Sequence, residues 1–196
     1  MVAPVPFRFD ADEHEYVNIA TGQVIPHITG MLAKTGWIDD RWYTEESSER
    51  GQAVHRLTAD YDLGALDLAS CVSRHRGYLL GHVACMKALR PTIEAVEEPI
   101  VHPTLGFGGR PDRRLVVHGV RTILEIKSGG PEKSHQVQTA LQAILSEAET
   151  GIPGEMLQRL ALYLQPSGRY KLIEHAERRD YLEARRVIRM CCGGQS

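Results

Sequence analysis

Two carboxylates and a lysine stand close together in the stretch GGRPDRRLVVHGVRTILEIKSGG, residues 108–130. Asp112 follows a proline, and Glu125 and Lys127 lie within an apolar run. If His118-Gly119 forms a two-residue hairpin turn, counting outward from the turn places Asp112 directly opposite Glu125. Directly opposed residues in antiparallel strands have Cβ atoms about 4.5–5.5 Å apart. Two carboxylates at that separation repel each other unless a cation lies between them.

The chemistry that these residue types favour is metal-assisted hydrolysis. Carboxylate oxygens are preferred ligands of Mg²⁺ and Mn²⁺. Residues two apart on a strand share a face, so Lys127 points to the same side as Glu125, where it could orient or deprotonate an attacking water or meet developing negative charge. Two acids, a lysine and a divalent metal are the parts of a phosphodiester hydrolysis site. On spacing alone, a solvated hairpin face that happens to carry an Asp, a Glu and a Lys explains the pattern equally well.

Composition and charge set only broad limits. The chain has 196 residues, 42% of them hydrophobic and 24% charged, with a formal net charge of −2 and a pI of about 6.5. These values are typical of a soluble domain and indicate no overall basic field for nucleic acid, although a local cleft can still be basic. No run approaches 18 apolar residues, and the first residues lack the pattern of a secretory signal. Four cysteines without framework spacing favour a reducing cytosol, so we expect a cytoplasmic protein of a bacterium or a phage-infected host.

The elements expected to position the hairpin form one α/β domain over residues 1–196, with a mixed central sheet. Residues of about 1–90 would supply a hairpin and helices, residues of about 91–175 the catalytic core, and residues of about 178–190 a last helix. The predicted elements are small strands within 7–26, a helix within 28–37 ended by Gly36, a helix from the N-cap Thr44 to about Leu63, a helix from about Leu66 to Leu89, strands at Thr92–Val101, Gly109–Val117 and Val120–Lys127, a helix capped by Ser134 and running to about Glu149, a hairpin around Pro166-Ser167-Gly168, and a helix from Arg178 to about Met190 followed by a CCGGQS tail.

The motif GRPD…LEIKSG resembles the core signature of the PD-(D/E)XK nuclease superfamily, with a glutamate as the second acid. Three further motifs resemble its RecB-like and lambda-exonuclease-like branch, particularly phage-type exonucleases. The segment HEYVNIATGQVIPHITGML also resembles the N-terminal segment of phage members, so the resemblance covers roughly residues 14 to 165. RGQAVHRL resembles the helical motif whose histidine, here His55, is a metal ligand. VEEPIV resembles the strand with an upstream glutamate, which corresponds to Glu97 with Glu98 as its rival. QVQTALQA resembles a Gln-x-x-x-Tyr motif in which Gln142 replaces the tyrosine.

The resemblance implies a restriction-endonuclease-like core and a metal-dependent exonuclease acting on linear double-stranded DNA. Mg²⁺ or Mn²⁺ would be held by Asp112, Glu125, the backbone carbonyl of Ile126 and His55. Glu97 would serve a second metal or a bridging water, and Lys127 would position or activate the attacking water. DNA end processing for recombination or repair would follow, with a single-strand annealing protein as a partner and a homo-oligomer conceivable.

Several residues keep two interpretations at this stage. His55 lies beside the apolar stripe of its helix and is either a ligand or a buried core histidine. A polar stripe on one helical face either binds phosphates and orders the lysine or faces solvent. Gly108 and Gly109 indicate a bulge or a close approach of the DNA backbone. The stripe consists of His135, Gln138 and Gln142; the other candidates for DNA contacts or positioning are Arg110 and Ser128, with Arg113 and Arg114 nearby, whereas Arg178, Arg185 and Arg189 are interpreted as a solvated face.

Two other functions remain open: an endonuclease of the same fold, structure-specific or restriction-like, and a non-catalytic DNA-binding module. A closed circular substrate distinguishes the endonuclease from an exonuclease, because only the endonuclease would cut it. The altered Gln138/Gln142 motif is the one feature that favours the non-catalytic DNA-binding module. A zinc site is not expected, because His75 and His82 are seven residues apart on one helix, about 10.5 Å along its axis. The cysteines lack the spacing of a cluster site, so we expect no iron–sulfur cluster; they are Cys71, Cys85, Cys191 and Cys192.

Overall fold

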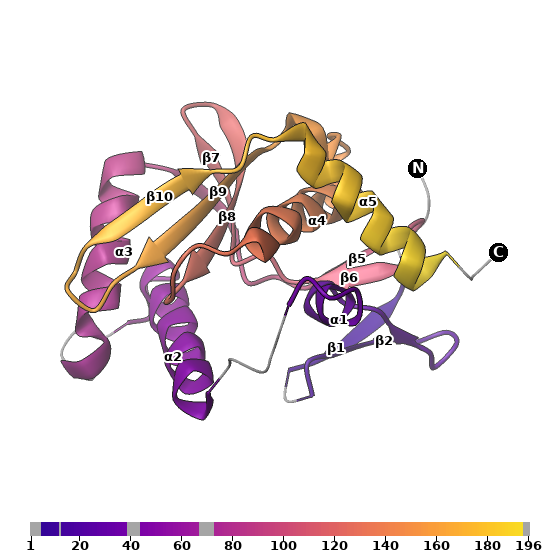
Figure 1. Ribbon diagram of the computed structural model, residues 1–196, viewed down its shortest axis with the longest axis horizontal. Coiled ribbons are helices and arrows are strands. Elements are labelled where there is room, and N and C mark those ends of the chain that lie inside the picture. The colour runs from indigo at the N-terminus through magenta and orange to yellow at the C-terminus, as the bar shows by residue number, and fades with distance from the viewer. Residues whose placement is uncertain (1–4, 12, 39–43, 67–72, 194–196) are drawn as a thin grey trace.

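The computed structural model describes residues 5–11, 13–38, 44–66 and 73–193, and its centre is a five-stranded mixed sheet (Figure 1). The strand order is β10-β9-β8-β7-β4. β8 and β9 are parallel, and the other neighbouring pairs of this sheet are antiparallel. A parallel pair needs a crossover, and α4 makes it here. The strands are β4 (Thr92–Val96), β7 (Arg113–Val117), β8 (Val120–Lys127), β9 (Gln158–Leu164) and β10 (Tyr170–Glu174).

Helices cover both faces of this sheet. One apolar cluster joins α1, α4 and α5 to residues such as Ile123, and another joins α2 and α3 to residues such as Leu124 and Ile126. Consecutive residues of β8 therefore face opposite layers, as the pleat of a strand requires. The fold is thus a mixed α/β sheet between helical layers, as predicted. The helices are α1 (Ile28–Lys34), α2 (Glu45–Asp62), α3 (Arg76–Leu89), α4 (Lys133–Thr150) and α5 (Arg178–Cys192), with short 3₁₀ helices η3 (Ser73–His75) and η4 (Gly154–Met156).

Two small sheets lie beside this core, below α4 and α5 in Figure 1. The first is antiparallel and contains β1 (Phe7–Asp10), β2 (Glu15–Asn18) and β3 (Val24–Ile25), which confirms the N-terminal strands expected from sequence. The second pairs β5 (Ile100–His102) with β6 (Phe107–Gly109).

The β7–β8 hairpin has the predicted register. Its turn residues His118 and Gly119 have φ values of 50° and 83°, the left-handed conformation that a tight two-residue turn requires. The pairing runs inward from the turn to Arg113 opposite Leu124. Asp112 precedes β7 by one residue, so it stands at the position opposite Glu125.

Two predicted strands are broken instead of continuous. The strand expected at Thr92–Val101 ends at Val96, because Glu97 has a left-handed φ of 47° and its N–H donates to the carbonyl of Asp112 at 3.0 Å. The strand expected at Gly109–Val117 likewise divides into β6 and β7. Both breaks fall beside Asp112, where the chain leaves one sheet and enters the other.

Three helix boundaries also differ from the predictions. α3 begins at Arg76, so the expected helical start at Leu66 is wrong, and residues 67–72 lie outside the described part of the chain. The N-cap of α4 is Glu132 instead of Ser134. His135, three residues into the helix, accepts the N–H of Glu132 at its Nδ1. α5 continues to Cys192, so the two cysteines expected in a tail are helical.

Positions 108 and 109 favour glycine because neighbouring side chains pack tightly against the backbone there. A Cβ at Gly108 would lie 2.9 Å from the ring of Tyr16, and one at Gly109 would lie 2.6 Å from Cδ1 of Ile28. Packing inside the protein therefore accounts for these glycines, instead of the bulge or the close approach of DNA that we expected. Within the described ranges, every helix is too short or too polar to cross a lipid bilayer.

Candidate active site

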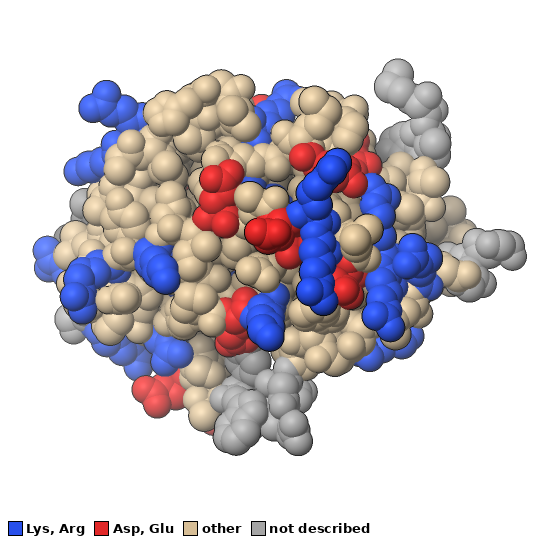
Figure 2. Space-filling model, turned by 45° about the horizontal axis from the view of Figure 1, so that its top comes forward, with Lys and Arg blue, Asp and Glu red and all other residues tan. Residues whose placement is uncertain are grey.

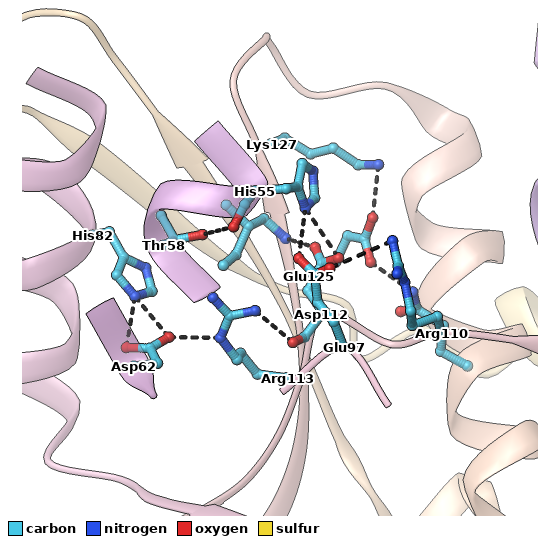
Figure 3. Close-up of polar contacts among 12 residues, drawn as sticks. His55, Thr58, Asp62, His82, Glu97, Arg110, Asp112, Arg113, Glu125 and Lys127 are labelled. Atoms are coloured by element: carbon cyan, nitrogen blue, oxygen red, sulfur yellow. Dashed lines mark hydrogen bonds and ion pairs between the residues drawn. The ribbon is translucent and has the colours of Figure 1, made fainter. Parts of the chain in front are cut away.

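Residues of the β7–β8 hairpin and its approach line a cavity of about 1100 Å³, at the end of the central sheet where β7 begins and β8 finishes. Asp112, Glu125 and Lys127 come from the hairpin and its approach, and His55 enters from α2. Glu97 enters from the left-handed break after β4. Figure 3 shows these five side chains converging on one place.

Three of these side chains form a compact set of possible metal ligands. One nitrogen of His55 and one carboxylate oxygen each of Glu97 and Asp112 lie within 4.8 Å of one another. His55 Nδ1 lies 3.2 Å from Asp112 Oδ1 and 3.9 Å from Glu97 Oε1. The His55 side chain is thus half-buried and lies against the acids. It does not lie inside the apolar core, as it would if it were a core histidine.

The donors fit a divalent cation. Oδ2 of Asp112 accepts the N–H of Ile126 at 2.6 Å, which leaves Oδ1 directed at the cluster. Oε1 of Glu97 is buried and, among the described residues, has no hydrogen-bond partner. A buried carboxylate oxygen without a donor is costly unless a cation compensates it. One imidazole and carboxylate oxygens suit Mg²⁺, Mn²⁺ or Zn²⁺ by ligand type.

Glu125 is held by three donors on the same face of the sheet. Its Oε1 accepts from Gln138 Nε2 at 2.7 Å and pairs with Lys127 Nζ at 2.8 Å, and its Oε2 accepts from Gln142 Nε2 at 2.6 Å. Lys127 also donates to Gln138 Oε1 at 3.0 Å. Gln138 and Gln142 of the polar stripe on α4 therefore face the acid and the lysine, and not solvent. Gln142 makes this contact from the position where the resembling motif has a tyrosine.

The pKa values around the cluster follow from burial and charge. Burial raises the pKa of Asp112, but the charges of His55 and Lys127 and hydrogen bonds to His55 and Ile126 outweigh it and lower the pKa to about 2. Burial lowers the pKa of His55, yet the Asp112 carboxylate raises it above its ordinary value overall. The pKa of Glu125 is raised by burial and by the Asp112 charge. A positive charge placed among these groups would relieve the strain between the two acids.

His135 does not reach the acids. It is buried, and its Nδ1 lies 3.0 Å from the hydroxyl of Tyr163 on β9. Burial lowers the pKa of His135 to about 3. This residue thus fixes the start of α4, while Ser128 lines the cavity from the segment that joins β8 to α4.

The arginines near Asp112 have different surroundings. Arg110 lines the cavity, 3.4 Å from Glu97 and over the ring of Phe9. Arg113 is fully buried and Arg114 pairs with Glu98 and Glu149, so the expectation that these two track phosphates is not supported. The arginines of α5 named in the sequence analysis are exposed, and one of them, Arg185, pairs with Glu155 at 2.6 Å.

Sequence reasoning missed the partner of Arg113. Arg113 Nε donates to the carboxylate of Asp62 at 2.6 Å, and Asp62 also holds His82. His82 thus pairs with an aspartate. Cys71 lies outside the described residues, so the absence of a zinc site on this helix stays a prediction. The available signal was that Asp62 follows His55 by seven residues, on the same face of α2. The cavity also contains Arg50 and His14, which the sequence did not single out.

Comparison with known proteins shows the fold. No protein-family model matches the chain, and no curated protein sequence matches it. A candidate exonuclease from Eubacterium rectale superposes with a TM-score of 0.50 at 13% identity, covering 82% of this chain and 69% of that chain. The alkaline exonuclease LHK-Exo from Laribacter hongkongensis matches with a TM-score of 0.44 at 15% identity over 85% of each chain. LHK-Exo in complex with dAMP gives 0.46 at 16% identity over 86% of each chain. The Eubacterium rectale match, at a TM-score of 0.50, supports the restriction-endonuclease-like α/β fold of this chain.

Proposed function

We propose that the protein is a divalent-metal-dependent exonuclease that hydrolyses phosphodiester bonds of linear double-stranded DNA. The observation that carries this proposal is the convergence of His55, Glu97 and Asp112 beside the Glu125–Lys127 pair, in one cavity. A non-catalytic DNA-binding module would not require a buried carboxylate oxygen that lacks a hydrogen-bond donor and is aimed at a histidine and a second acid.

The metal would be Mg²⁺ or Mn²⁺, held by His55, Asp112 and Glu97, with Glu125 and the Ile126 carbonyl as further ligands. When bound, such an ion supplies a Lewis acid for the phosphate and lowers the pKa of water. The same positive charge would satisfy the oxygen of Glu97 that has no donor. A titration with Mn²⁺ counts the ions that the protein binds. A count of one would assign Glu97 to this ion, and a count of two would allow Glu97 to serve the second.

The side chains on β8 and α4 would orient the reacting groups. Gln138 and Glu125 orient the ammonium of Lys127 at 3.0 and 2.8 Å, on the same side as the candidate ligands. From there the ammonium would direct a water at phosphorus or meet the charge of a non-bridging oxygen. Hydrolysis forms a bond from the water oxygen to phosphorus, breaks the bond to the 3′-oxygen and returns a proton to that leaving oxygen. Arg110, at the cavity wall, is placed to contact a phosphate.

The preference for DNA ends rests on the resemblance of the motifs to phage-type exonucleases, and the Eubacterium rectale structure, described as a candidate exonuclease, has the same fold. We infer that end processing serves recombination or repair in the cytosol, with a single-strand annealing protein as partner. A homo-oligomer is compatible with this function.

The test uses end-labelled linear duplex and covalently closed circular DNA, each with Mg²⁺, Mn²⁺ or EDTA. We expect mononucleotides from the linear duplex alone, loss of activity in EDTA, and loss in Lys127→Ala. Lys171→Ala, which changes an exposed lysine of β10, is the matched control and should retain activity. Cleavage of the closed circle would identify an endonuclease instead. DNA binding without cleavage of either substrate would contradict the enzymatic proposal.

A further inference from the structure

A second group of charged side chains is buried directly behind the candidate metal ligands. Asp62 is the last residue of α2, His82 lies in α3 and Arg113 begins β7. Each of these side chains is at most 1% exposed. His82 Nε2 lies 3.0 and 2.9 Å from the two carboxylate oxygens of Asp62, and Arg113 Nε donates to Oδ2 at 2.6 Å (Figure 3). One aspartate therefore ties two helices to the start of the catalytic hairpin.

The group reaches the candidate metal centre through the main chain of Asp112. Arg113 Nη1 donates to the carbonyl oxygen of Asp112 at 2.6 Å. The N–H of Glu97 donates to the same oxygen at 3.0 Å. A single carbonyl thus holds two of the candidate ligands in place: Asp112, to which it belongs, and Glu97, whose left-handed backbone it anchors.

The same helix makes two adjacent contacts with this point. His55 and Asp62 are seven residues apart on α2, which is about two turns and returns to the same face. His55 meets the side chain of Asp112 at 3.2 Å, while Asp62 holds the neighbouring Arg113. The second contact fixes the height and rotation of α2, and these determine where the imidazole of His55 lies.

Stability alone is a weak reason for such a group. A buried ion pair is often no better for stability than apolar side chains of the same volume, because desolvation offsets the attraction. Nδ1 of His82 and Nη2 of Arg113 are also buried without a hydrogen-bond partner among the described residues. The planar guanidinium of Arg113 has several N–H donors in a fixed geometry, which an apolar side chain lacks. These donors reach the Asp62 carboxylate and the Asp112 carbonyl at the same time.

We propose that Asp62, His82 and Arg113 form a positioning network that sets the spacing of His55, Glu97 and Asp112, and thereby the affinity of the site for Mg²⁺ or Mn²⁺. The inference rests on the metal-dependent function proposed above. The three residues are positioning residues, since they act through the Asp112 carbonyl and the placement of α2. Loss of partners that orient metal ligands typically weakens metal binding by about 10–100-fold.

The test compares two buried aspartates that each pair with an arginine. Asp62→Asn removes the negative charge opposite Arg113. Asp180→Asn removes the negative charge opposite Arg159, a pair that lies 2.9 Å apart and anchors α5. Mn²⁺ affinity is measured by calorimetry, and stability by thermal unfolding in EDTA. We expect Asp62→Asn to bind Mn²⁺ at least about tenfold more weakly than the wild-type protein. Asp180→Asn should lose stability but bind Mn²⁺ as the wild-type protein does.

Arg113→Lys keeps the test decisive if Asp62→Asn does not fold. Lysine retains the positive charge opposite Asp62 but lacks the rigid fork that also reaches the Asp112 carbonyl. We expect a loss of Mn²⁺ affinity on the order of fivefold or more. Wild-type affinity in the folded variants would overturn the positioning role and leave the metal site intact. Absence of Mn²⁺ binding by the wild-type protein would instead remove the metal-dependent function, and this inference with it.

Discussion

Glu97 and Glu98 are neighbours in the chain, yet their carboxylates have different surroundings. Glu97 is 19% exposed and faces His55 and Arg110, whereas Glu98 is 56% exposed and pairs with Arg114. The left-handed backbone of Glu97 turns the two side chains apart. Substitutions of these two adjacent glutamates therefore form a matched pair, in which Glu98 is the control for Glu97.

We predict that Glu97→Gln lowers the rate of Mg²⁺-dependent DNA hydrolysis by on the order of 100-fold, because a charged group aimed at the metal position is lost. Glu98→Gln should leave the rate within about twofold, because surface ion pairs contribute little. Single-turnover cleavage of linear duplex measures both. A larger loss in Glu98→Gln than in Glu97→Gln would reverse the assignment of the upstream acid.

His135 makes the free energy of unfolding depend on pH. Burial lowers its pKa to about 3 from the ordinary value of 6.5, so the unfolded chain binds more protons between these two values. Stability from this residue is therefore complete above about pH 6.5 and is lost as the pH falls toward 3, by at most about 1.4 kcal/mol per pH unit. We predict that His135→Gln, which keeps an acceptor, flattens this dependence.

Urea unfolding at several pH values between 4 and 7 measures the effect. His118→Asn is the control, because His118 is an exposed turn residue whose left-handed backbone asparagine tolerates. Its pH dependence should match that of the wild-type protein. An unchanged slope in His135→Gln would show that other buried groups cause the acid sensitivity.

At the scale of elements, two helical glycines distinguish packing from propensity. A Cβ at Gly77 in α3 would lie 1.8 Å from the carbonyl oxygen of Pro166 in the β9–β10 turn, whereas one at Gly51 in α2 would meet nothing within 4 Å. We predict that Gly77→Ala lowers the free energy of unfolding by about 1–3 kcal/mol. Gly51→Ala should raise it by up to about 1 kcal/mol through helix propensity. Equal effects in urea denaturation would contradict this packing of α3 on the sheet.

The elements that follow local rules could be predicted from the sequence. The β7–β8 hairpin depends on a turn dipeptide and alternating residues, so its register followed from counting outward from His118-Gly119. The helix expected to run from Ser134 to about Glu149 was predicted from local signals, and its apolar residues at helical spacing lie in the core: Val137, Leu141, Ile144 and Leu145. The placement of Asp112 and Glu125 on one face is a consequence of that hairpin alone.

Features that depend on distant partners could not be predicted. The break at Glu97 requires a hydrogen bond to the Asp112 carbonyl, and the cap of α4 requires the His135 imidazole. Asp62 and Arg113 are far apart in the chain and meet only because α2 packs beside β7. The family resemblance indicated candidate ligands, but it carried no information on what holds them.

At the scale of the whole molecule, charge is local. The net charge is −2, and the face in Figure 2 shows Lys and Arg side chains next to Asp and Glu ones instead of one broad basic field. The cavity has the same mixture, because Arg50, Arg110 and Lys127 line it together with the acids. We therefore expect attraction of DNA to depend on this cavity, with the bound metal adding to its positive charge.

The most direct test of the proposed metal centre is anomalous diffraction from crystals of the protein grown with Mn²⁺. We predict a peak at bonding distance, about 2.0–2.3 Å, from Asp112 and from at least two of His55, Glu97 and Glu125. Such a peak would establish the position from which the proposed hydrolysis proceeds. Crystals that contain saturating Mn²⁺ in solution but no manganese among these side chains would contradict the metal centre and the hydrolysis built on it.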